Sequence, residues 1–223
     1  MKNITQLHRA ATTGLLICSV LFVALILSGG CASEPSPPAA SKAPPLPAGV
    51  TLHQDKDING VWLAPEFNFK GYDTVYVADP MFAAVERTNE VAMRAMAMKA
   101  LSDQMVEHIR KTEMFPVVTT QTNELKPDAR KLILENTIIE YEKGGGGARF
   151  WAGLYGAGQP VIKVRGRILD GDKLMCVYEM RRSGESGGAR VFGGYKNDED
   201  IQRNDIRDLA SDFADFIKRT AAK

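Results

Sequence analysis

Apolar and polar residues follow two periods along this chain, and these periods predict strands and helices in a definite order. Alternation with β-branched and aromatic residues predicts a strand over 72–78, YDTVYVA. Apolar residues then recur every three or four positions from Val91 to Ile109, which predicts an amphipathic helix over about 89–111. The next stretch, FPVVTT, predicts another short strand. A strand, a helix and a strand in this order favour a right-handed parallel crossover.

Three longer strands are predicted next, and they form an antiparallel meander. They cover about residues 131–141, 160–169 and 173–182. The Asp-Gly pair of DGD, residues 170–172, suits a tight turn because glycine tolerates a positive φ. In the middle strand apolar and basic positions alternate, so we expect one face to be packed and the other to be wet and basic. The basic side of this strand carries Lys163, Arg165 and Arg167.

A second amphipathic helix is predicted over about residues 198–219. Acidic residues occupy its first turn, and Lys218 and Arg219 its last, which matches the helix dipole at both ends. Its apolar stripe consists of Ile201, Leu209, Phe213, Phe216 and Ile217. The chain therefore predicts an α/β (α+β) domain: a small mixed sheet with an antiparallel meander, two helices packed on one face, and the basic face left open.

The first 30 residues have the pattern of an export signal. Lys2 and Arg9 precede an apolar run at 15–27 that is too short to span a bilayer comfortably. The run ends in LSGGCAS, which resembles the lipobox of bacterial lipoproteins and implies lipidation at Cys31. Ser28 stands where that motif usually has leucine. An ordinary secretory signal and an uncleaved anchor stay open as alternatives.

A proline-rich tether follows the predicted lipidation site. Residues 32–50 hold six of the chain's 11 prolines and little that can pack. Proline-rich chain extends by about 3.1 Å per residue, so these residues reach on the order of 60 Å. We therefore predict a signal peptide at 1–30, a lipidated cysteine and linker at 31–54, and one globular domain at 55–223. Because Ala32 follows the cysteine, the lipoprotein resemblance implies an outer-membrane anchor facing the periplasm.

Composition and charge argue against several classes of function. Without Lys2 and Arg9 the chain has 26 basic and 27 acidic residues, which gives no support for nucleic-acid binding. Cys176 lies in an apolar-rich stretch, KLMCVYEM, which is typical of a buried thiol. The three histidines lie in the leader, beside the linker and on the first helix, so their spacing suggests neither a metal cluster nor a triad. We expect no cofactor, no metal and no catalysis.

One phrase occurs twice, as GGARFWAG at 146–153 and as GGARVFGG at 187–194. In a meander the first and third strands run in the same direction, so both copies leave the sheet at the same end. Glycine permits close backbone approach, and arginine and aromatic residues are typical interface anchors. We predict a partner-binding surface formed by Arg149, Phe150, Trp151, Tyr155, Arg190, Phe192 and Tyr195. Closure of the core by these rings, or glycine bulges that extend the strands, stays open as the alternative.

A family resemblance rests on APEFNFKGYDTVYVADP, the long helix after it, and the glycine-rich region that contains both copies. These stretches resemble bacterial envelope lipoproteins whose globular domain is classified as a domain of unknown function. The likeness covers most of residues 64–218. It implies a small mixed α/β domain similar to the amino-terminal domain of TolB and to lipoproteins that activate penicillin-binding proteins or assist ABC transporters. The group offers no settled catalytic residues.

Together these patterns indicate a non-enzymatic, membrane-tethered binding or assembly module. The leading interpretation is recognition of an envelope protein through the two Gly-Arg-aromatic segments. The alternative is binding of an anionic envelope polymer, either peptidoglycan or lipopolysaccharide, by the basic sheet face. The residues proposed for that alternative are Lys163, Arg165, Arg167 and Arg181.

Overall fold

The computed structural model describes residues 45–65, 67–83, 91–142, 160–184 and 198–223. Within these ranges one mixed sheet has the strand order β1-β7-β6-β5-β2-β4, and β3 pairs with β5 beside β2. The strands are β1 (Gly60–Leu63), β2 (Thr74–Val77), β3 (Met81–Phe82), β4 (Val117–Thr119), β5 (Lys131–Glu142), β6 (Val161–Asp170) and β7 (Lys173–Ser183). The helices are α2 (Val91–Arg110), α4 (Asp198–Ala221) and a 3-10 turn, η1 (Thr122–Glu124).

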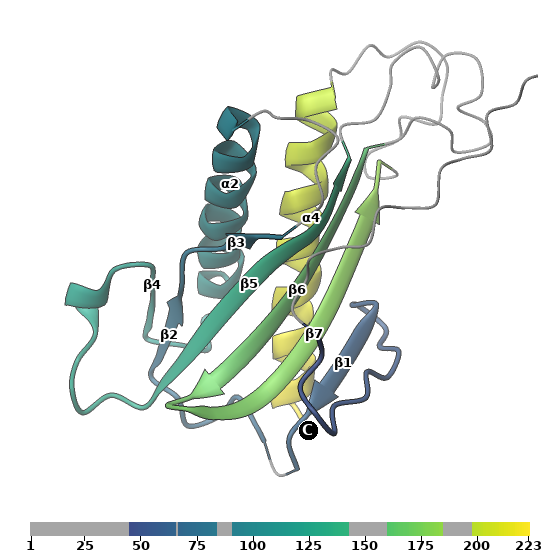
Figure 1. The fold of residues 1–223 in the computed structure, drawn as a ribbon. Helices are drawn as coiled ribbons and strands as arrows, with labels where there is room; N and C mark the ends of the chain where they lie inside the picture. The colour runs from purple at the N-terminus through teal and green to yellow at the C-terminus, as the bar shows by residue number, and fades with distance from the viewer. Residues whose placement is uncertain (1–44, 66, 84–90, 143–159, 185–197) are drawn as a thin grey trace, which may run out of the picture. The chain divides into compact units, whose positions relative to one another are not determined.

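The predicted α/β (α+β) architecture is confirmed. Strands β5, β6 and β7 form the antiparallel meander, and β2 pairs in parallel with both β4 and β5. Figure 1 shows both helices against the same face of the sheet. The turn between β6 and β7 is tight, with Asp170 paired to Lys173 and Gly171 at a φ of 58°. Strands β1 and β3, of four and two residues, were not predicted because they are too short to show alternation.

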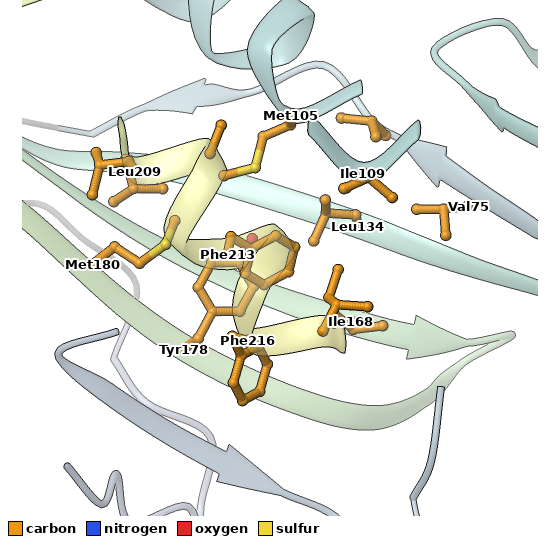
Figure 2. Packing of buried hydrophobic residues seen from close by; sticks show 14 of the residues in the cluster. Val75, Met105, Ile109, Leu134, Ile168, Tyr178, Met180, Leu209, Phe213 and Phe216 are labelled. Atoms are coloured by element: carbon orange, nitrogen blue, oxygen red, sulfur yellow. The ribbon is translucent and has the colours of Figure 1, made fainter. Parts of the chain in front are cut away.

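The two helices and the sheet enclose one hydrophobic core. Leu209, Phe213, Phe216 and Ile217 of the predicted α4 stripe are all buried, whereas the side chain of Ile201 lies outside the described residues. Figure 2 shows Phe213 beside Tyr178, and the two ring centroids are 4.4 Å apart. Each fully buried aromatic side chain stabilises the fold by about 1.5–3 kcal/mol.

A contact across three strands sets the register of the meander. Gly166 of β6 lies directly between Asn136 of β5 and Tyr178 of β7. The Tyr178 ring crosses over Gly166, and its hydroxyl donates a hydrogen bond of 2.6 Å to Asn136 Oδ1. A Cβ atom at residue 166 would lie 2.0 Å from Cζ of that ring, so only glycine fits there. A one-residue slip would send these side chains to the opposite face of the sheet.

The chain between the linker and β1 is attached to the end of α4. His53 and Val61 exchange two backbone hydrogen bonds, of 2.9 and 2.8 Å. Arg219, in the last turn of α4, pairs with Asp55 and Asp57 at 2.5 and 2.9 Å. These bonds hold the segment before β1 at the carboxyl end of the helix.

We predict that Gly166→Ala and Tyr178→Phe both lower the free energy of unfolding. Gly166→Ala overpacks the site and costs about 1–3 kcal/mol. Tyr178→Phe leaves the buried Asn136 oxygen without its donor and costs about 1–3 kcal/mol. Urea unfolding followed by circular dichroism measures both changes. Tyr76→Phe is the matched control, because that hydroxyl makes no hydrogen bond to a described residue. Equal stability of Tyr178→Phe and this control would contradict the account.

Candidate binding rim and outer sheet face

Three strand ends lie side by side at one end of the meander, and we call them the rim. Glu142, the last residue of β5, pairs with Val161, the first residue of β6. Val161 in turn pairs with Ser183, the last residue of β7. The segments that carry the two copies of the repeated phrase therefore begin at the same end of the sheet, on two strands with β6 between them. The strand ends confirm the common starting point that the meander predicted.

The predicted binding residues of both copies lie outside the described residues. They are Arg149, Phe150, Trp151, Tyr155, Arg190, Phe192 and Tyr195. The described structure consequently fixes where their segments begin, and their role stays a prediction.

Buried polar side chains of α4 hold the rim strands in place. The Tyr141 hydroxyl donates to Gln202 Oε1 at 2.8 Å, and Gln202 Nε2 donates to the carbonyl oxygen of Glu142 at 3.1 Å. The backbone N–H of Gly184 donates to Asp205 Oδ2 at 3.0 Å. Gln202 and Asp205 are both almost completely buried. The ends of β5 and β7 are therefore tied to the first turns of the helix.

These positioning residues were missed in the sequence. Gln202 and Asp205 lie three positions apart on the same side of α4 as Leu209, so they interrupt its apolar stripe with polar groups. A buried polar group needs a hydrogen-bond partner. A polar interruption of an apolar helix face is thus the signal that could have found them.

The face of the sheet without helices, here called the outer face, is not simply basic. All four predicted cations meet a carboxylate on another strand, and for Arg181 that strand is the next but one. Lys163 and Arg165 pair with Glu179 at 2.8 and 2.6 Å. Arg167 pairs with Glu135 of β5. Arg181 approaches Glu140, also of β5, at 3.6 Å.

The expectation of an open basic face is therefore corrected: four cations are offset by three carboxylates. The physical reason is cross-strand register, because Glu179 lies opposite Arg165, and Glu135 lies opposite Arg167. Opposite charges on directly opposed residues attract each other across strands. The alternation within β6 showed which residues point outward, but it could not show what faces them.

Glu179 is the acidic centre of this outer face. Burial alone raises the pKa of its carboxyl group, but the hydrogen bonds from Lys163 and Arg165 outweigh burial and hold the pKa below its ordinary value of 4.5. Glu179 is therefore ionised at neutral pH. Its charge stabilises the fold only while the carboxyl group stays deprotonated.

A half-open hollow of about 450 Å³ lies far from the rim, at the carboxyl end of α4. Its apolar wall is formed by Val61, Leu63, Phe67 and Phe216. The Arg219 guanidinium at its edge is already paired with two carboxylates. The other residues that line the hollow are Asp55, Asn68, Thr220 and Lys223.

Cys176 lies in the interior of the sheet. It is fully buried, and burial strongly raises the pKa of its thiol. This confirms the interpretation of a structural thiol, because a reactive cysteine needs an accessible thiolate. Among the residues described, no helix is both long and apolar enough to cross a bilayer.

The chain matches the model of a known protein family. The family described as a domain of unknown function, DUF4410, matches residues 52–191, which is more than half of the chain. A search of curated proteins found no match.

Several solved structures are similar to parts of this chain. A PelC dodecamer of Paraburkholderia phytofirmans has 14% identity and a TM-score of 0.42, covering 68% of this chain and 93% of that one. A Xanthomonas campestris protein of the DUF330 family has 12% identity and a TM-score of 0.42, covering 72% and 91%. Lipoprotein GNA1162 of Neisseria meningitidis has 11% identity and a TM-score of 0.27, covering 55% and 86%. At these values, the likenesses assign neither a partner nor an activity to this chain.

We predict that acid weakens the fold through Glu179. Because the pKa of Glu179 is lower in the folded state, its contribution is present above pH 4.5 and is lost as the pH falls through the folded-state pKa. Urea unfolding measured between pH 7 and pH 3 should show this loss for the natural chain. Glu179→Gln should be less stable at pH 7 and should lose less stability with acid. Parallel pH profiles for the two proteins would count against the ion-pair assignment.

Proposed function

This chain belongs to the DUF4410 family, and we propose that it is a non-enzymatic binding module that recognises a protein partner at the rim. The observation that carries this proposal is the register row Glu142, Val161 and Ser183. This row starts two chemically alike segments at the same end of the sheet, on β5 and β7, with β6 between them. Each segment contains arginine and aromatic residues among glycines.

The composition of the two segments suits recognition of a protein. Tyrosine, tryptophan and arginine are the residues that most often dominate the binding energy of an interface. The segments begin on strands that α4 holds through Gln202 and Asp205. Ordered attachment points reduce the conformational entropy that binding must overcome. Two such segments, attached to strands that α4 holds in place, are therefore suited to selective recognition of a protein.

The proposal includes a lipid anchor at Cys31 and a location at the outer membrane, facing the periplasm. The support for it is the basic leader, the apolar run and the lipobox-like LSGGCAS. The proline-rich tether would let the domain contact proteins at some distance from the anchor. The proposed likeness to TolB and to activators of penicillin-binding proteins makes an envelope assembly protein the preferred class of partner.

Binding of an anionic polymer is the weaker alternative. It would use Lys163, Arg165, Arg167 and Arg181, and each of these cations already has a carboxylate partner. A polyanion would compete with those carboxylates and would also approach their charge. Protein recognition at the rim requires no such exchange, and we favour it for that reason.

We predict that Trp151→Ala and Phe192→Ala each weaken partner binding by about tenfold or more, because each removes a large interface anchor. The partner is first captured in living cells by a photo-crosslinking residue at position 154, beside the proposed anchors, and identified by mass spectrometry. Its affinity for the purified chain is then measured by titration at low and high salt. Arg167→Glu is the comparison variant, since it reverses one charge of the outer face.

The two candidate functions give opposite patterns in this experiment. Protein recognition predicts loss with the aromatic variants, little change with Arg167→Glu and a shallow salt dependence. If Arg167→Glu and added salt abolish binding while both aromatic variants bind normally, the rim proposal is wrong and the polymer alternative is favoured.

A further inference from the structure

The edges of a sheet are its exposed lines of backbone hydrogen-bonding groups, and proteins usually block them. Two of the edges in the described part of this sheet are blocked. Along β1, His53 pairs with Val61 on the side away from β7. Along β4, the Arg110 guanidinium donates two hydrogen bonds, of 2.9 and 2.6 Å, to the carbonyl oxygen of Val118.

Strand β3 differs from these two edges. It pairs with β5 alone, and no described strand lies on its other side. The backbone N–H of Ala83 donates to the carbonyl oxygen of Ile138 in β5 at 2.9 Å. Backbone groups alternate in direction along a strand, so Met81 and Ala83 bond toward β5. The N–H and C=O of Phe82 consequently point to the open side.

The side chains of β3 give the two faces of this edge different chemistry. The Phe82 ring lies on the helix side, 5.7 Å from the Tyr141 ring, with Cζ of Arg94 5.4 Å from its centroid. Met81, the neighbouring residue, therefore points to the outer face, where it pairs with Thr137. Met81 is 51% exposed.

Exposed apolar side chains gather at this end of the domain. Among the described residues, the large hydrophobic side chains that are exposed are Met81, Val91 and Met96. All three lie on β3 or on the first two turns of α2, and Figure 1 places the start of α2 at the same end as the rim. Of these three side chains, Met81 lies on the open edge itself, and Val91 and Met96 lie on α2, outside that edge.

We infer that the open edge of β3 is a docking site for an extended segment of the protein partner, which adds to the sheet beside Phe82. This inference rests on the proposed function and names the chemistry of its partner. The added strand would bond to the Phe82 backbone and place alternate apolar side chains against Met81 and against the Phe82 ring. Ile138, opposite β3, is four residues before the end of β5, or roughly 13 Å from the rim. One partner can therefore contact both surfaces.

The test compares two methionines of equal exposure in the full chain. Met81→Lys puts a charge on the open edge, which blocks strand addition. Met96→Lys is the matched control, because Met96 is also 51% exposed but lies on α2. A benzophenone side chain placed at position 154, which lies in the first segment but is not a proposed anchor, captures the partner in living cells. We expect Met81→Lys to reduce the yield of the adduct about tenfold and Met96→Lys to leave it within about twofold.

Three outcomes separate this inference from the proposed function. An adduct that is lost with Met81→Lys alone supports the inference. An adduct of equal yield in Met81→Lys and Met96→Lys overturns it and leaves recognition at the rim in place. If benzophenone yields no adduct at position 154 or at Met81 in an otherwise natural chain, both are overturned. A second measurement uses the captured partner in purified form. Strand addition predicts slower hydrogen exchange at the Phe82 amide when the partner is bound, and unchanged exchange would reject strand addition.

Discussion

The contact of Tyr178 with Asn136 across Gly166 is the constraint on which the remaining structure depends. This contact joins the three strands of the meander in one row. It is possible in one register only, because the Tyr178 ring fills the space that any side chain larger than glycine's would need at residue 166. The same ring packs against Phe213, so the register of the sheet and the position of α4 are fixed together. The strand ends at the rim depend on that register and on a β-bulge between Ile138 and Glu140, which shifts the pairing of β5 with β6 by one residue.

The surface of the domain is organised around the same strands. On the outer face, register places carboxylates opposite cations, so the charges satisfy one another instead of attracting a polyanion. At the sheet edges, Arg110 and His53 occupy backbone groups that would otherwise pair with other chains. The surface that stays chemically available in the described structure is near the rim, where β3 is open and apolar side chains are exposed.

The long elements could be predicted from the sequence because their periodicity extends over many residues. This applies to α2, α4 and the three strands of the meander. The short strands could not be predicted: GVWL of β1 and MF of β3 are strands because β7 and β5 lie beside them, not because of their own pattern. The partners of Arg165 and Arg167 were missed for a related reason, since Glu179 and Glu135 become neighbours only after the strands pair.

Only part of the candidate site could be predicted from the sequence. The repeated phrase indicated two similar segments, and the meander indicated that they begin at the same end of the sheet. The buried Gln202 and Asp205, which tie that end to α4, were missed because polar residues near the start of a helix suggest solvent exposure. Their role became clear only from the hydrogen bonds to Glu142 and Gly184.

The claim that both segments begin from one rim is tested most directly by the distance between the ends of β5 and β7. Spin labels can be attached through Glu142→Cys and Ser183→Cys in a chain whose Cys18 and Cys31 are replaced by serine, and the buried Cys176 is inaccessible to the reagent. Two strand spacings separate these positions, so strong dipolar coupling at a backbone separation of about 10 Å is expected. A separation of about 30 Å, close to the length of a strand, would place the ends at opposite sides of the sheet and contradict the account.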